Sequence, residues 1–177
     1  MTGWVILGHA SAVQRFDGVG LAAAALATSL GLASAAVSAY WALGGTALLD
    51  TVGGALERLG RERPPGVVVA LWVIVVLKVL SAVAPLVFVG VGDGQLPAWT
   101  KGRQMRLLGW LAAIGLTLYG GVLTVVGLLV QAGVIEATDD ADEHALAWHA
   151  FVWDPWFALW GVAFIVAMWR SRPKPAG

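Results

Sequence analysis

An amine in the middle of a long apolar run is the group in this sequence best placed to do chemistry. Lys78 is the one charged residue between Gly66 and Val91. A helix over this run is roughly 37 Å long, enough to cross a hydrocarbon core about 30 Å thick, and places the amine on the order of 18 Å from either end. Because a charge at that depth is costly, we predict that Lys78 faces the inside of a bundle and has a polar partner. The alternative is a helix shifted in the membrane, so that the amine snorkels to water.

Three kinds of chemistry fit such an amine. It could relay a proton or a substrate, act as the counter-ion of an acidic ligand, or form a Schiff base. The partners that the sequence offers are Ser81, one turn further along, and Asp50 or Asp154 if their helices carry them inward.

Asp154 and His149 form the second candidate group. Asp154 could act as a counter-ion or as a general base together with His149. However, Asp154 is followed by Pro155, and this pair is typical of a helix start, with the aspartate as N-cap and the proline in the first turn. We therefore predict that Asp154 is the N-cap of the last helix, with the acid–base site as the alternative. His144 and His149 are five residues apart and do not share one helical face, so we predict no metal site and no cofactor.

The composition restricts the class of protein. The chain has 177 residues, of which 59% are hydrophobic and 12% charged, whereas soluble proteins have about 25% charged residues. The absence of cysteine excludes disulfides, thiolate metal sites and dithiol redox chemistry. The net charge of zero gives no indication of a nucleic-acid partner.

The apolar segments predict an all-α, four-helix transmembrane bundle that forms a single domain over residues 1–177. The predicted spans are residues 19–45, 66–91, 107–133 and 155–169, with an interfacial helix at 142–153. The first and third spans have small residues at three- and four-residue steps, so we predict that they pack closely through these faces. The small residues are Gly31, Ala35, Ser38, Ala42 and Gly45 in the first span, and Gly109, Ala113, Gly120, Thr124 and Gly127 in the third.

Four spans place both termini on the same side of the membrane. The lysines and arginines of that side are Arg15, Lys101, Arg103, Arg106, Arg170, Arg172 and Lys174, and those of the other side are Arg58, Arg61 and Arg63. This asymmetry predicts that both termini are cytoplasmic. The end of the first span and the start of the fourth then meet at the outer rim. The residues predicted to gather there as a ligand site are Tyr40, Trp41, Asp50, His149, Trp153, Asp154 and Trp156.

Two short motifs carry a resemblance to a known family. Tyr40 to Gly45 reads Tyr-Trp-Ala-Leu-Gly-Gly, and Trp153 to Phe157 reads Trp-Asp-Pro-Trp-Phe. In these motifs the chain resembles a widespread bacterial, largely actinobacterial, family of small four-span membrane proteins of unknown function. The resemblance implies the four-helix fold and a multi-pass protein of the bacterial cytoplasmic membrane. It implies no activity.

Three classes of function fit these observations. The first is a bundle that binds or carries a small amphiphilic or anionic ligand, with its head at Lys78 and its tail against the tryptophans between Trp148 and Trp160. The second is an oligomeric or accessory subunit, in which Lys78 pairs with an acidic group of a membrane-protein partner. The third is a membrane enzyme that uses Lys78, Asp154 and His149. In each case membrane lipid surrounds the protein.

Overall fold

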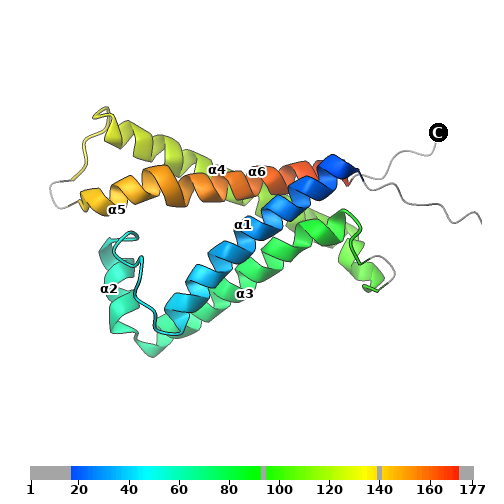
Figure 1. Cartoon of the computed structure of the whole chain (residues 1–177), viewed down its shortest axis with the longest axis horizontal. Helices are drawn as coiled ribbons and strands as arrows, with labels where there is room; N and C mark the ends of the chain where they lie inside the picture. The colour runs from blue at the N-terminus through cyan, green and yellow to red at the C-terminus, as the bar shows by residue number, and fades with distance from the viewer. Residues whose placement is uncertain (1–16, 93–94, 139–140, 172–177) are drawn as a thin grey trace, which may run out of the picture.

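The computed structural model of the chain describes residues 17–92, 95–138 and 141–171, and these residues form helices and no strand (Figure 1). The helices are α1 (Gly18–Ala42), α2 (Gly54–Glu62), α3 (Pro65–Phe88), η1 (Ala98–Lys101), α4 (Arg103–Gln131), α5 (Glu143–Trp148), η2 (His149–Trp153) and α6 (Asp154–Arg170). In this part of the chain, four helical segments are long and apolar enough to cross a membrane. The prediction of an all-helical protein with four long apolar helices is confirmed. Arg15, Arg172 and Lys174, which support the predicted orientation, lie outside the described residues.

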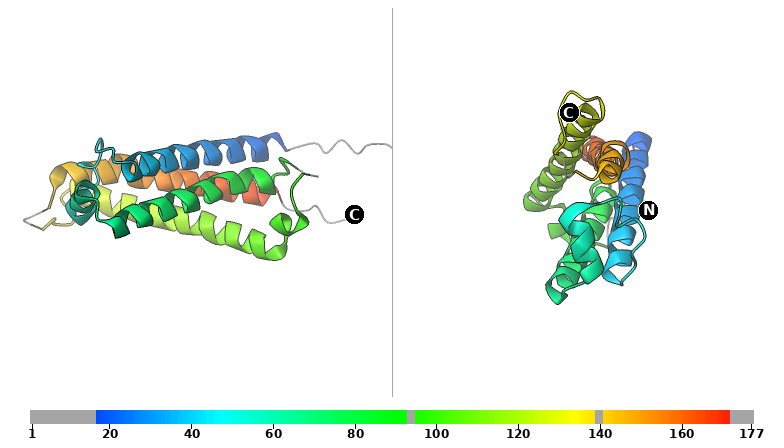
Figure 2. Two further views of the ribbon diagram at one scale, coloured as in Figure 1. Left: turned by 90° about the horizontal axis from the view of Figure 1, so that it is seen from below. Right: turned by 90° about the vertical axis from the view of Figure 1, so that its left-hand side faces the viewer.

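The long helices form two antiparallel pairs, α1 with α3 and α4 with α6. The pairs are joined because α6 also packs against α1, and Figure 2 shows α6 between α1 and α4 when the bundle is viewed end-on. By contrast, α3 and α4 have little contact with each other. The helix α6 supplies the largest buried side chains, which are Trp160, Phe164 and Met168. The core of the protein therefore lies around α6.

The small residues of α1 and α4 form packing faces, which meet α6 and, in the case of α1, also α3. A Cβ atom at Gly31 would lie 2.6 Å from Cζ2 of Trp160 in α6 and 2.6 Å from Cβ of Ala82 in α3. A Cβ atom at Gly120 would lie 2.5 Å from the carbonyl oxygen of Asp154. Side chains at these two positions would hold the helices apart, as expected for small residues in membrane bundles.

The prediction that Asp154 is the N-cap of a separate fourth helix is wrong. The segments α5, η2 and α6 follow one another without a break, and the run Glu143–Arg170 as a whole is long and apolar enough to cross a membrane. Its N-cap is Asp142, whose carboxylate accepts a hydrogen bond of 3.1 Å from the nitrogen of Ala145. The predicted interfacial helix at 142–153 is thus the first part of the last long helix.

Pro155 explains the irregular turn in the middle of this run. Proline has no N–H, and in a regular helix its ring would clash with the carbonyl group four residues earlier, that of Phe151. The segment η2 is a π-helical turn, in which the N–H of Asp154 bonds to the carbonyl oxygen of His149, five residues back. The wider turn accommodates the proline without ending the helix.

Candidate functional site

The amine of Lys78 lies between α1 and α6. Its Nζ donates a hydrogen bond of 2.8 Å to the hydroxyl of Ser38 and one of 3.5 Å to the carbonyl oxygen of Ser34, both in α1. It also lies 5.3 Å from the ring centroid of Phe157 in α6. Among the described residues, none of the ion pairs includes Lys78. The amine therefore has a neutral environment of two oxygens and one aromatic ring.

The partners of Lys78 show where the amine lies along the length of the bundle. Lys78 is near the middle of α3, and Phe157 is near the middle of the run Glu143–Arg170. The side chain is half-buried, and Ser38, which is 2% exposed, lies one turn before the end of α1 at Ala42. The amine thus stays within the helical part of the bundle.

None of the partners that the sequence suggested for Lys78 contacts it. Ser81 follows Lys78 on α3, but a helical side chain extends towards the N-terminus of its helix, which is away from Ser81. Asp50 contacts His144, and Asp154 contacts His149. The actual partner, Ser38, belongs to the small-residue face of α1, which the sequence had suggested only as a packing surface.

The Tyr-Trp-Ala-Leu-Gly-Gly motif ends α1 and shapes the loop that follows. The indole of Trp41 donates a hydrogen bond of 2.9 Å to the carbonyl oxygen of Ala47. Gly44 has φ +107°, a backbone conformation that glycine adopts without strain. The ring of Tyr40 lies directly against Gly45, where a Cβ atom would overlap it. The motif is therefore explained by local structure.

Arg63 holds the end of α1 against the start of α3. Its guanidinium donates hydrogen bonds of 3.0 Å to the carbonyl oxygens of both Trp41 and Ala42. These carbonyl groups belong to the last turn of α1, where helical acceptors have no partner within the helix. A cation at this position also interacts favourably with the helix dipole.

We expect the substitution Arg63→Gln to lower the free energy of unfolding by about 1–2 kcal/mol, because it leaves these carbonyl oxygens without their charged donor. The matched control is Arg61→Gln, since Arg61 forms only an exposed pair of 2.8 Å with Glu57, and such pairs contribute about 0.5 kcal/mol. Thermal unfolding in detergent, followed by tryptophan fluorescence, measures both variants. Equal stability of the two variants would contradict the capping role of Arg63.

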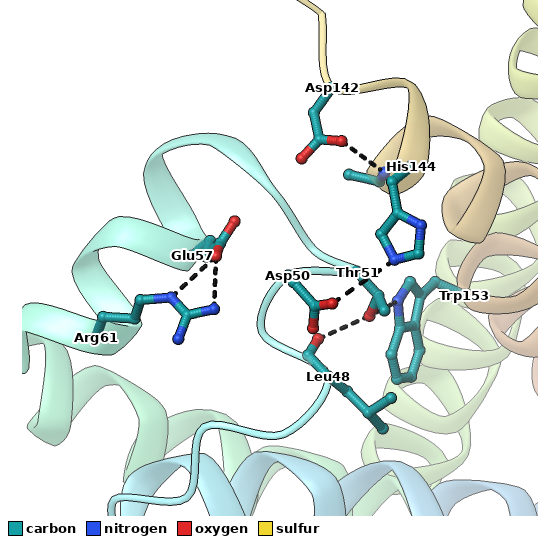
Figure 3. Close-up of polar contacts among 9 residues, drawn as sticks. Leu48, Asp50, Thr51, Glu57, Arg61, Asp142, His144 and Trp153 are labelled. Atoms are coloured by element: carbon teal, nitrogen blue, oxygen red, sulfur yellow. Dashed lines mark hydrogen bonds and ion pairs between the residues drawn. The ribbon is translucent and has the colours of Figure 1, made fainter.

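The two sequence motifs meet at this end of the bundle. The rings of Trp41 and Trp153 are in edge contact, with centroids 6.2 Å apart. The indole of Trp153 donates a hydrogen bond of 3.0 Å to the hydroxyl of Thr51, which in turn donates to the carbonyl oxygen of Leu48 (Figure 3). Sequence reasoning missed Thr51, because a lone threonine in a loop carries no motif.

Two His–Asp pairs lie near this end, and they differ in burial. His144 and Asp50 are 3.7 Å apart, with side chains 58% and 59% exposed (Figure 3). Nδ1 of His149 and Oδ1 of Asp154 are 3.3 Å apart, with side chains 34% and 5% exposed. The π-helical turn between His149 and Asp154 brings residues five apart onto one face, which a regular helix would not do. Within the described residues, no three His, Asp or Glu side chains gather as a metal site would require.

The predicted cluster at the rim is therefore present only in part. Trp41 and Trp153 touch, and Asp154 has His149 as its partner. Trp156 lies apart from them, because its indole donates a hydrogen bond of 3.1 Å to the carbonyl oxygen of Leu30 in α1.

The family of the chain can now be stated. Residues 31–164 match the family described as Protein of unknown function (DUF3995). The chain belongs to this family. The matched range includes both motifs, the Lys78 contacts and both His–Asp pairs, so they all lie within the family's own domain. No curated protein and no solved structure matches the chain.

Proposed function

We propose that this DUF3995 protein is an integral membrane protein that binds a small amphiphilic ligand, with an anionic head group next to Lys78. The observation that carries the proposal is the neutral environment of the amine, which lacks a carboxylate partner among the described residues. A lysine ammonium has three N–H donors, and a cation in an apolar interior is stabilised most by an opposite charge. The head group of the ligand would supply that charge.

The surroundings of the amine suit an apolar tail. The ring of Phe157 lies beside the amine. The ring of Tyr119 in α4 is in edge contact with the ring of Phe157, at 5.6 Å between centroids. Tyr119 is 52% exposed, and α3 and α4 have little contact with each other, so this side of the site is not closed by packing. Trp160, expected from the sequence to cover the tail, is only 1% exposed and belongs to the core instead. The aromatic contacts of the tail would come from Phe157 and Tyr119.

The location that we propose is the bacterial cytoplasmic membrane, with both termini in the cytoplasm. Arg170 forms an ion pair of 3.3 Å with Asp17, so the start of α1 and the end of α6 share one end of the bundle. The basic residues in the sequence are more numerous at this end than at the other, which supports the orientation by the positive-inside rule.

Lipid retention tests the proposal. We expect the wild-type protein, extracted in mild detergent, to carry a bound acidic amphiphile in native mass spectrometry, and Lys78→Met to carry about tenfold less. A lost hydrogen bond to a charged group costs about 1.5–3 kcal/mol, which corresponds to such a factor. Lys101→Met makes the same substitution in η1 and serves as the matched control. Equal loading of wild type and Lys78→Met would overturn the proposal.

The same spectra test the accessory-subunit alternative. The outward face of α3 is apolar and exposed, with Val69 at 64% and Val73 at 53%. However, the amine of Lys78 is directed at α1 and α6 and not at this face, which favours a ligand within the bundle over a partner outside it. Loss of a multi-chain species in Lys78→Met, with no change in bound amphiphile, would favour the alternative.

A further inference from the structure

We infer that His149 and Asp154 form a proton-binding site that controls how strongly the Lys78 site binds an anion. The inference rests on the ligand binding proposed above and adds its regulation. Three observations support it. The carboxylate of Asp154 is buried, the imidazole of His149 is partly exposed, and the pair lies close to the amine of Lys78.

Asp154 is the better shielded member of the pair. Its side chain is 5% exposed, and its polar contact among the described residues is the imidazole of His149 at 3.3 Å. The backbone of α4 comes close at Gly120, where a Cβ atom would lie 2.5 Å from the carbonyl oxygen of Asp154. This close approach holds the backbone of Asp154 against α4, and the low exposure of the side chain shows that the carboxylate has little contact with water. A buried carboxylate of this kind is favoured when a proton or a cation neutralises it.

His149 is the more exposed member of the pair and gives protons a route to the carboxylate of Asp154. Its side chain is 34% exposed, and it lies in the π-helical turn η2 (His149–Trp153) that places it over Asp154. An imidazole changes its charge in the physiological pH range and commonly transfers protons. When the pair takes up one proton, its net charge changes from −1 to zero, whichever of the two side chains holds the proton.

The other groups around this pair come from α4, from the end of α1 with the loop after it, and from α3. From α4, Tyr119 is the titratable group that interacts electrostatically with Asp154. From the end of α1 and the loop after it, the neighbours of this turn are Trp41 and Thr51, which contact Trp153 and do not titrate. The charged group on the side of α3 is Lys78.

The pair is close enough to the amine to influence an anion there. Asp154 and Phe157 are three residues apart on one face of α6, a rise of about 4.5 Å. The amine of Lys78 lies 5.3 Å from the ring of Phe157, so the carboxylate and the amine are separated by a distance on the order of 10 Å. At that distance inside a protein, one charge changes the binding of another by about tenfold. A negative pair repels an anionic head group, whereas a neutral pair does not.

The test uses the full chain in phosphatidylcholine nanodiscs and a dansyl-tagged long-chain alkyl sulfonate, whose charge is constant across the pH range. Energy transfer from tryptophan to dansyl measures binding. We expect the wild type to bind the sulfonate about tenfold more tightly at about pH 5 than at about pH 8. The double variant His149→Gln, Asp154→Asn should bind the sulfonate equally at both pH values, because neither position can then take up or release a proton. The matched control, Asp50→Asn, should keep the wild-type pH dependence, because Asp50 contacts the exposed His144.

A second measurement separates this inference from the proposed function. Histidine imidazole NMR without ligand should show that Asp154→Asn changes the titration of His149 and leaves that of His144 unchanged. A pH dependence of sulfonate binding that survives in the double variant overturns the coupling. If the wild type binds the sulfonate no more tightly than Lys78→Met, the proposed function fails and the coupling fails with it. In that case the NMR titration still decides whether His149 and Asp154 share a proton.

Discussion

Replacement of Gly120 by valine is expected to force α4 (Arg103–Gln131) away from α6 (Asp154–Arg170) and to lower the free energy of unfolding by about 3 kcal/mol. A Cβ atom at Gly120 would lie 2.5 Å from the carbonyl oxygen of Asp154 and 2.8 Å from the carbonyl carbon of Phe157. Both neighbours are backbone atoms of α6, which cannot move aside by a side-chain rotation. The two helices must therefore separate along the most extensive contact of α4.

The adjacent residue provides the control. Gly121 lies in the same helix, and a Cβ atom there would meet nothing within 4 Å, so Gly121→Val should change the stability by about 0.5 kcal/mol or less. Both variants replace a mid-helix glycine by the same residue, so their difference reports packing alone. Unfolding in detergent by sodium dodecyl sulfate, followed by tryptophan fluorescence, measures this difference. Similar losses in the two variants would show that α4 and α6 do not pack as closely as the structure indicates.

The features that the sequence predicted correctly depend on composition and on chain topology. Four long apolar segments are visible in the sequence as continuous runs, because each is apolar enough, over enough residues, to cross a membrane. The proximity of Trp41 and Trp153 also follows from the sequence, since an up-and-down bundle brings the end of the first long helix and the start of the last to one rim. Their edge contact at 6.2 Å agrees with that reasoning.

The features that the sequence did not reveal depend on contacts between distant residues. An Asp-Pro pair has the same sequence at a helix start and after a π-helical turn. Which of the two forms here depends on the packing of this segment against its neighbours. The close approach of Gly120 to Asp154 and of Gly127 to Ala150 packs the run Glu143–Arg170 against α4 before the proline, where the helix continues without a break. In the same way, the choice of Ser38 as the partner of Lys78 depends on how α1 is rotated against α3 (Pro65–Phe88), which the pattern of one helix does not determine.

Replacement of Trp160 by alanine is expected to be the most damaging change in the core, with a loss of about 3–5 kcal/mol in the free energy of unfolding. Trp160 is 1% exposed and lies where α1, α3 and α6 meet, with its ring against Gly31. Its ring also stacks on Phe157, at 6.1 Å between centroids, and Phe157 lies beside the amine of Lys78. The cavity left by alanine would remove support from Phe157, so retention of an acidic amphiphile should fall together with stability.

The substitution Trp160→Phe separates the contribution of ring packing to stability from that of the polar indole N–H. The indole N–H of Trp160 is buried and has no acceptor within the described residues, and a buried donor without a partner costs about 1–3 kcal/mol. Phenylalanine removes that donor and keeps much of the ring, so its loss of stability should be well below that of alanine. Trp99→Ala, at a position 66% exposed, controls for the general effect of removing a tryptophan. Equal losses of stability in Trp160→Phe and Trp160→Ala would contradict this account. They would mean that the indole N–H makes a stabilising hydrogen bond, so that the junction of α1, α3 and α6 is polar and not apolar.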